Sequence, residues 1–480
     1  MRTNTISGFG KRSFQTLLQT MMIANWPYTS VAQTAALPEK PPADLPARPF
    51  VLPRIDSKVL ANRLKVIVAE SHRIPIVTIR LGIRAGSVLD TPGQPRLAAA
   101  VASQLTAGTD RYTSLQIREA AAELGGSVGA SASDDYAVVS GTALAENAVP
   151  LIGLMADVVL HPSFPESELS IYRSLATQGL TVQRQNPDFL AQEQLAKALY
   201  GPGHPYGTIA ATQASIQSLS KDKLTDFHRA HYSPAGAVLV IVGDVRSNDI
   251  FALVEKSFGS WRANSAAKQS PIGPTAGGGK KIYLVNRPNS VQSNIVIGNR
   301  SLRRDDPDYL PLFVANAILG GGSTSRLYLN VREKRGYAYD VRSTSTAREL
   351  SGEFTEGAQT RTDVTADAVK EMLADADQIR RELVTQDELN DVRNYIKGRF
   401  VMQMTSQTGL ADQLLIQQMY KLPPDYIATY RDRVGAVTVA DVQRVAQKHM
   451  RPNEAVIIVV GDAEKLRGPL SQVATVEEVR

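Results

Sequence analysis

An internal repeat constrains the fold of this 480-residue chain more than any other feature of its sequence. Residues 231–244 and 449–462 both run from a His through a Pro into an apolar stretch ending in Gly-Asp, and their prolines lie 218 positions apart. Ser220 and Thr438, candidate N-caps of the preceding helices, have the same spacing. A register held across a helix and a strand predicts two copies of one structural unit.

The repeat divides the chain into five predicted segments. The first unit spans residues 51–261 and the second spans residues 281–480. Between them, residues 262–280 combine Ala, Ser and Pro with three successive glycines, a composition that continues neither a helix nor a strand and predicts a linker. Residues 33–50 are rich in Pro and Ala and predict an extended arm, which follows an N-terminal segment at 1–32.

Hydrophobic periodicity predicts the elements of each unit. Alternation of apolar and polar residues, or short apolar runs, predicts strands at 77–83, 137–142, 294–298 and 353–357. Amphipathic periodicity predicts long helices at 114–124, 166–184, 364–382 and 386–404. Strands that are adjacent in sequence and followed by helices predict an α+β fold: two homologous units, each a mostly antiparallel sheet covered by helices on one face.

The N-terminal segment bears on localisation. Three basic residues are its only charges, an apolar stretch covers residues 17–24, and Ser30-Val31-Ala32 provides a small-residue cleavage site. This order is typical of a secretory signal peptide and predicts a periplasmic or secreted protein. Polar residues interrupt the apolar stretch, so an unstructured tail on a cytoplasmic protein is the alternative.

Composition excludes several classes of function. The 53 basic residues barely exceed the 47 acidic ones, and no basic run is interleaved with aromatic residues, so we expect no nucleic-acid partner. The chain has no cysteine, which excludes a disulfide, a thiolate metal site and a cysteine nucleophile. No apolar run after the N-terminal segment reaches about 18 residues, so we expect no membrane span.

Several motifs together resemble the pitrilysin/insulinase family of zinc metallopeptidases, the inverzincins. Their order and spacing over residues 50–465 are more specific than any one of them. The motifs are Asn62-Arg63-Leu64, Gly86-Ser87, His161-Pro162-Ser163-Phe164-Pro165, Gly203-His204-Pro205-Tyr206-Gly207, Leu319-Gly320-Gly321-Gly322-Ser323-Thr324-Ser325-Arg326-Leu327 and Val331-Arg332-Glu333-Lys334-Arg335-Gly336-Tyr337-Ala338-Tyr339.

The resemblance also implies that the zinc site is degenerate. The family binds zinc with two histidines of an H-x-x-E-H helix and a distal glutamate, and the glutamate between the histidines is the general base. Here the matching positions are Ala99, Ala102 and Ser103, and the distal ligand falls at Gln178 or Gly179. Alanine neither binds zinc nor accepts a proton, so we expect no metal in this chain and no peptide hydrolysis by it alone.

The second unit retains an Arg332 and Tyr339 pair that the resemblance assigns to substrate contact. In single-chain family members, an Arg and a Tyr at these places contact substrate near the scissile carbonyl, where they stabilise developing negative charge. The sequence predicts a helix over Ser325–Lys334, a cap at Gly336 and then a strand, a corner that brings the two side chains together. The alternative is a surface ion pair for Arg332 and a core position for Tyr339.

Other residues of chemical interest have structural interpretations. His228 and His231 have helical spacing but sit at a helix end without a carboxylate in a ligand position, which is typical of ordinary helix-end histidines. His204, between Gly and Pro, is typical of a turn. Gly320-Gly321-Gly322 lacks the Lys-Ser/Thr ending of a phosphate-binding loop, so helix termination and close backbone approach are favoured.

The sequence therefore favours a non-catalytic subunit of a heterodimeric zinc endopeptidase. A homologous H-x-x-E-H chain is the expected partner and the holder of the zinc, and unfolded peptides are the expected substrates. One alternative is a structural or peptide-binding protein of the same fold, like the core subunits of respiratory complexes. Another is a homodimeric peptide clamp.

Overall fold

The computed structural model describes residues 51–262 and 279–479. The predicted signal peptide at 1–32 and the arm at 33–50 lie outside the described residues, as does most of the predicted linker at 262–280. Everything described belongs to one compact unit that begins at Val51. The boundaries of the repeated units at 51–261 and 281–480 therefore stay predictions.

The first half begins with three strands and two helices, continues with a two-stranded hairpin and five helices, and ends with one strand and one helix. Its strands are β1 (Ile55–Val59), β2 (Lys65–Glu70), β3 (Ile76–Ile83), β4 (Ser127–Ala132), β5 (Ala137–Leu144) and β6 (Val238–Gly243). Its helices are α1 (Leu97–Gln104), α2 (Ser114–Glu123), α3 (Ala148–Leu160), α4 (Glu166–Gln185), α5 (Pro187–Tyr200), α6 (Gln213–Gln217), α7 (Lys221–His231) and α8 (Ser247–Phe258). Short 3₁₀ turns occur at Ser87–Leu89, Leu105–Ala107, Ala145–Asn147 and Pro205–Gly207.

The second half follows the same plan. Its strands are β7 (Lys281–Asn286), β8 (Gln292–Ser301), β9 (Ala338–Ala347), β10 (Gly352–Arg361), β11 (Val456–Gly461) and β12 (Thr475–Val479). Its helices are α9 (Tyr309–Gly320), α10 (Thr365–Arg381), α11 (Gln386–Met404), α12 (Gln407–Met419), α13 (Tyr426–Ala436), α14 (Val439–His449) and α15 (Ala463–Ser471). A π-helix spans Tyr328–Lys334 and a 3₁₀ turn spans Thr362–Val364.

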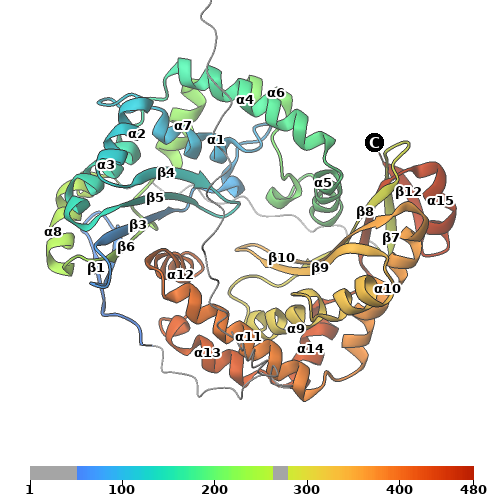
Figure 1. The fold of residues 1–480 in the computed structure, drawn as a ribbon. Coiled ribbons are helices and arrows are strands. Elements are labelled where there is room, and N and C mark those ends of the chain that lie inside the picture. The colour runs from blue at the N-terminus through green and yellow to red at the C-terminus, as the bar shows by residue number, and fades with distance from the viewer. Residues whose placement is uncertain (1–50, 263–278, 480) are drawn as a thin grey trace, which may run out of the picture. The chain divides into compact units, whose positions relative to one another are not determined.

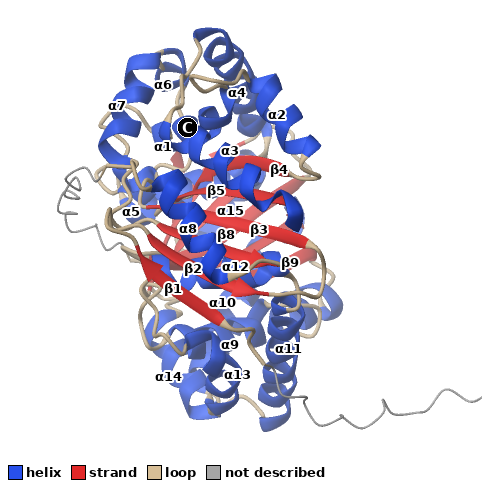
Figure 2. Cartoon of the chain, turned by 90° about the vertical axis from the view of Figure 1, so that its left-hand side faces the viewer, coloured by secondary structure: helices blue, strands red, loops and turns tan. Residues whose placement is uncertain are grey.

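The two halves form two sheets of matching topology. The strand orders are β1-β2-β6-β3-β5-β4 and β12-β7-β11-β8-β10-β9, and helices flank both sheets (Figures 1 and 2). The parallel pairings are β2 with β6 and β7 with both β11 and β12, while the remaining neighbours are antiparallel. Ser220 and Thr438 cap α7 and α14 through their side chains, as the repeat predicts. The predicted α+β fold with two mostly antiparallel sheets is confirmed.

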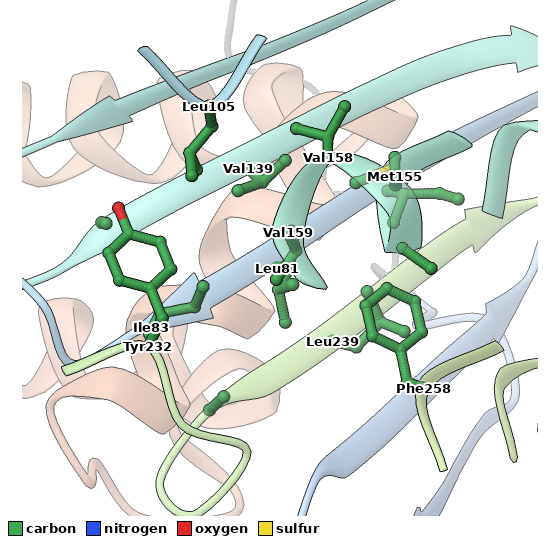
Figure 3. Packing of buried hydrophobic residues seen from close by; sticks show 14 of the residues in the cluster. Leu81, Ile83, Leu105, Val139, Met155, Val158, Val159, Tyr232, Leu239 and Phe258 are labelled. Carbon is green, nitrogen blue, oxygen red and sulfur yellow. The ribbon is translucent and has the colours of Figure 1, made fainter. Parts of the chain in front are cut away.

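The core of the first half lies between its sheet and α1 and α3. Odd-numbered residues of β3, such as Leu81 and Ile83, point into this core, where Figure 3 shows them near Val139 of β5 and Val158 of α3. Ala102 of α1 is fully buried in the same cluster. Burial of these apolar side chains stabilises the sheet and fixes the position of α1.

The opposite face of each sheet receives a helix from the other half, a feature that the prediction of single-face coverage lacks. α12 packs on β3 and β6 of the first sheet, and α5 packs on β8 and β11 of the second (Figure 1). Gly82 allows this approach, because a Cβ there would lie 2.6 Å from Leu415 Cδ1 of α12. On the same face Arg80 Nε donates to Asp412 Oδ1 at 2.8 Å.

A buried polar network joins the turns of two equivalent hairpins, β4–β5 and β9–β10. Arg348 follows β9 and contacts Asp134 Oδ2 at 2.7 Å, Glu353 Oε2 at 3.0 Å and the Tyr200 hydroxyl at 3.0 Å. Asp135 accepts from the Tyr420 hydroxyl at 2.8 Å, and also from the backbone N–H of the residue after Arg348. The network connects both halves, and removing Arg348 would leave Glu353 without its cation, while Asp134 would keep its pair with Arg96 at 3.0 Å.

Among the helices of the described ranges, none has both the length and the apolar character that a bilayer crossing requires.

Replacing Arg348 with Ala should lower the free energy of unfolding by about 2–3 kcal/mol, because Glu353 loses its cation and Asp134 keeps only Arg96. Replacing Arg303, whose pair with Asp305 is half exposed, should cost less than about 1 kcal/mol. Urea denaturation followed by circular dichroism measures both. Equal, small losses for the two variants would contradict a stabilising role for the network.

Candidate functional site

Helix α1 carries the positions that correspond to a zinc-binding motif. Its N-terminus is held by Asp90, whose carboxylate accepts from the backbone N–H groups of Arg96 at 2.6 Å and Ala98 at 2.8 Å. Burial of the carboxyl group raises the pKa of Asp90 to about 6. The helix is therefore well anchored even though it holds no ligating side chain.

The side chains at the motif positions are unsuited to zinc. Ala99 is half-buried, Ala102 is fully buried in the core and Ser103 is exposed. On α4, Gln178 is exposed, while Gly179 shares a cavity of about 220 Å³ with Ala100 of α1. α1 and α4 line the same cavity, but the alanine and glycine residues at these positions have no side-chain atom that can bind a metal ion. In residues 51–262 and 279–479, no cluster of three His, Asp or Glu side chains could hold a metal ion.

The conspicuous histidines have structural partners. His228 Nε2 lies 2.9 Å from the carbonyl oxygen of Val159, and burial lowers the pKa of this imidazole. His231 packs on Phe227 with ring centroids 4.5 Å apart. His204 Nδ1 accepts from a backbone N–H at 3.0 Å in its turn, and burial beside two arginines lowers the pKa of His204 to about 4.

The glycine run after α9 has the predicted structural role. α9 ends at Gly320, where a Cβ would lie only 2.2 Å from the backbone nitrogen of Ser343 in β9. The missing side chain therefore permits close approach of α9 to β9. The segment between α9 and β9, which contains the π-helix, therefore lies against the second sheet.

Arg332 lies on the π-helix that follows this run, where the sequence predicted an ordinary helix over Ser325–Lys334. The wider turn is seen in the bond from the backbone N–H of Arg335 to the carbonyl of Asn330, five residues back, at 3.0 Å. Gly336 ends the helix with φ +63°, and its N–H donates to the carbonyl of Arg332 at 3.0 Å. The predicted cap is confirmed, and π-helices of this kind are frequent at functional sites.

Tyr339 occupies a β-bulge at the start of β9. Ala338 pairs with Thr360 and Asp340 pairs with Gln359, so Tyr339 has no partner opposite it on β10. A bulge re-aims side chains, and the Tyr339 side chain is 82% exposed. β9 is also the outer strand of its sheet. The predicted alternative of a core position for Tyr339 is wrong.

The structure brings Arg332 and Tyr339 together. The guanidinium carbon of Arg332 lies 4.8 Å from the ring centroid of Tyr339 and 4.7 Å from that of Tyr328, so the cation contacts two aromatic rings. Its carboxylate neighbour is Glu333, at 3.5 Å from Nε. Such cation–π contacts contribute about 0.5–1 kcal/mol each at exposed sites and hold the guanidinium in one orientation. Two adjacent donors, a guanidinium and a phenol, are thus presented at the surface.

Sequence reasoning missed two residues of this site. Tyr328 lies four positions before Arg332, a spacing that places both on one helical face and was available as a signal. Asn330 donates its side-chain amide to both carboxylate oxygens of Asp375 at 3.0 Å and to Glu371 Oε2 at 3.1 Å, which ties the π-helix to α10. No local pattern indicates these contacts, because α10 follows much later in the chain.

Two buried carboxyl groups, those of Asp375 and Glu356, lie next to the contact between Asn330 and α10. Burial raises the pKa of Asp375 to about 6, although the hydrogen bond from Asn330 opposes the rise. Glu356 of β10 is 2% exposed, and its Oε2 has no hydrogen-bond partner among the described residues. Burial, followed by the charge of Asp375, raises the pKa of Glu356 well above its ordinary value of 4.5.

Comparison with known proteins relates both halves to one peptidase family. The profile of the insulinase domain (peptidase family M16) matches residues 65–212, and that of the peptidase M16 inactive domain matches residues 218–396. An uncharacterized zinc protease of Bacillus subtilis is 27% identical over 72% of this chain and 83% of its own length. One of Streptomyces coelicolor is 23% identical over 85% of this chain and 90% of its own length.

Two solved structures share the fold. A peptidase M16 inactive domain from Pseudomonas fluorescens superposes with a TM-score of 0.79 at 29% identity, covering 85% of this chain and 98% of that one. A protease from Helicobacter pylori superposes with a TM-score of 0.80 at 19% identity, covering 86% of this chain and 100% of that one. At that identity the second likeness shows the fold alone.

Replacing Glu356 with Gln should make the chain more stable relative to wild type as pH rises above 4.5. The folded protein binds the Glu356 proton more tightly than the unfolded chain does. The stability from this group is therefore fully present below the unfolded pKa and is lost as pH rises through the raised folded pKa. Urea unfolding at pH 4.5, 6 and 7.5 measures the difference. Replacing the exposed Glu382 with Gln is the control, and parallel profiles for Glu356→Gln and wild type would contradict the prediction.

Proposed function

Because the chain belongs to the insulinase family of peptidases (peptidase family M16) and is of its non-catalytic type, we propose that it is one subunit of a heterodimeric zinc endopeptidase. The partner is a homologous chain that carries the H-x-x-E-H motif and holds the zinc. This chain supplies part of the substrate-binding surface and the donors Arg332 and Tyr339. The complex acts on unfolded peptides in the periplasm or outside the cell.

One observation carries the proposal: two donors are held together at the surface of a chain whose metal-binding positions are Ala99, Ala102 and Ser103. Arg332 stacks on Tyr339 at 4.8 Å. The π-helix and the β-bulge that present them are irregularities of the kind enriched at active sites. A chain without zinc ligands has no reaction of its own for these donors to assist, so they favour a reaction carried out by a second chain.

The chemistry of the pair suits attack on an amide. When the scissile carbonyl is attacked in the partner's active site, negative charge develops on the carbonyl oxygen. A guanidinium is always charged and a phenol donates without titrating near neutral pH, so both can stabilise that charge. The stacking contacts fix the guanidinium before the substrate arrives, which reduces the reorganisation that the reaction requires.

The outer position of β9 favours extended peptides as substrates. The strand begins at Ala338, directly before Tyr339, and its outer backbone edge is unpaired within the described sheet. An unfolded peptide can add to such an edge through backbone hydrogen bonds, which tolerate varied side chains. A peptide that bound at this edge would lie beside the two donors.

The isolated chain should bind no zinc and cleave no unfolded peptide, because no motif position offers a ligand. Metal analysis after dialysis against zinc and a fluorogenic peptide assay measure the two properties. Proteolysis that is sensitive to a chelator in the pure chain would show that the proposed division of roles is wrong.

In the complex with an H-x-x-E-H homologue, Arg332→Ala or Tyr339→Phe should lower kcat about 100-fold or more, as expected for loss of one transition-state donor. KM should change less, since the pair acts on charge that develops during reaction. Arg381→Ala and Tyr395→Phe remove exposed groups of the same kinds on other helices and are the matched controls.

Activity that is unchanged by the double substitution at 332 and 339 would contradict the proposal and favour a structural or peptide-binding protein of the same fold. Native mass spectrometry of the purified complex distinguishes the heterodimer from a homodimeric peptide clamp. Two chain species are expected, and a single species would indicate a homodimeric clamp.

A further inference from the structure

We infer that Asn330 is a positioning residue for Arg332, acting through a hydrogen-bonded clamp between the π-helix and Asp375 and Glu371 of α10. The inference rests on the proposed function, because it concerns how the donor pair is held. Among the described residues, the side chain of Asn330 forms hydrogen bonds only with α10. Any effect of Asn330 on the reaction would therefore arise from the position that it gives to Arg332.

The position of Arg332 depends on its own short segment. Its aromatic contacts are with Tyr328 in the same π-helix and with Tyr339 only seven residues later, and its ion pair is with the adjacent Glu333. No described contact of the Arg332 side chain reaches α10 or α11. Whatever fixes the π-helix against the rest of the fold therefore decides where the guanidinium points.

Asn330 takes part both in the backbone hydrogen bonding of the π-helix and in its side-chain contact with α10. Its carbonyl accepts the five-residue bond from the N–H of Arg335 at 3.0 Å, which defines the π-turn around Arg332. Its side-chain amide donates to both oxygens of Asp375 at 3.0 Å and to Glu371 at 3.1 Å. The backbone geometry of the π-turn and the contact with α10 are thus set by the same residue.

Two other polar contacts hold this segment, at its ends. Arg326 pairs with Glu388 of α11 at 2.9 Å, and Arg335 pairs with Glu371 of α10 at 2.8 Å. Both use long arginine side chains with several rotatable bonds, which permit small shifts of the backbone. Asn330 has a short side chain with two torsions and lies two residues before Arg332, so its clamp restrains the donor most directly.

The charges around the clamp explain why an amide is needed at this place. Asp375 faces Glu356 from β10 and Glu371 from its own helix, and the cations near it are Arg326 and Arg335. An amide presents two N–H donors to these carboxylates without adding charge. A methyl group at residue 330 would leave the oxygens of Asp375 without their donor in a buried site.

The test uses the assembled complex and measures kcat and KM separately. Asn330→Ala should lower kcat about tenfold with KM nearly unchanged, and should leave assembly with the partner chain intact. In an Arg332→Ala background the same substitution should have no further effect on kcat, because a positioning residue acts only through the group it positions. Asn453→Ala, an exposed asparagine on the same half, is the control and should leave kcat unchanged.

A second variant separates positioning from stability. Asp375→Asn weakens the clamp from the α10 side while it removes a buried carboxyl group whose pKa is raised, so it should lower kcat without lowering the urea midpoint at pH 7.5. Unchanged kcat in Asn330→Ala and Asp375→Asn would overturn the inference. It would also be overturned if Asn330→Ala lowered kcat by the same factor in the Arg332→Ala background as in wild type. If Arg332→Ala itself has no effect, the proposed function fails and the inference fails with it.

Discussion

Each half of the protein completes its core with a helix from the other half. α12 covers the inner face of the first sheet and α5 covers that of the second, so neither sheet completes its core with its own half alone. The central strands β6 and β11 are buried along their whole length as a result. Unfolding one half would expose the apolar face of a helix and a strand in the other, which couples the two halves energetically.

This coupling also positions the candidate site. The polar network around Arg348 lies at the end of β9, and the bulge at Tyr339 lies at its start, so one strand links the junction of the halves to the donor pair. α10 supports the π-helix from the other side through Asn330. The donors are exposed, but the elements that carry them are anchored in buried structure, which is how a fold presents reactive groups without losing their geometry.

The repeat and the hydrophobic periodicity predicted the architecture because both are local properties of the sequence. The predicted helix at 386–404 has the observed bounds, and the predicted strand at 77–83 begins one residue late. Periodicity can indicate the apolar face of a helix, yet it does not show which sheet that face covers, so the packing of α12 and α5 on the sheets of the other halves was missed. Long-range packing is decided by shape at residues such as Gly82, whose role is visible only beside Leu415.

The site was predictable to a similar depth. The Arg332 and Tyr339 pair came from the family resemblance, and the glycine cap at Gly336 came from ordinary helix-ending chemistry. The π-helix was not predictable, because its sequence has the same periodicity as an α-helix and the wider turn accompanies a contact with a distant helix. The bulge depends on register against β10, and a chain read alone does not contain that register.

The proposed activity requires two different chains. The most direct measurement is a titration in which this chain is added to a fixed amount of its H-x-x-E-H homologue while hydrolysis of an unfolded peptide is followed. Activity should rise with each addition and reach a plateau at one chain of each kind per complex. Activity of the homologue that is already maximal alone, and does not change over the whole titration, would contradict the account.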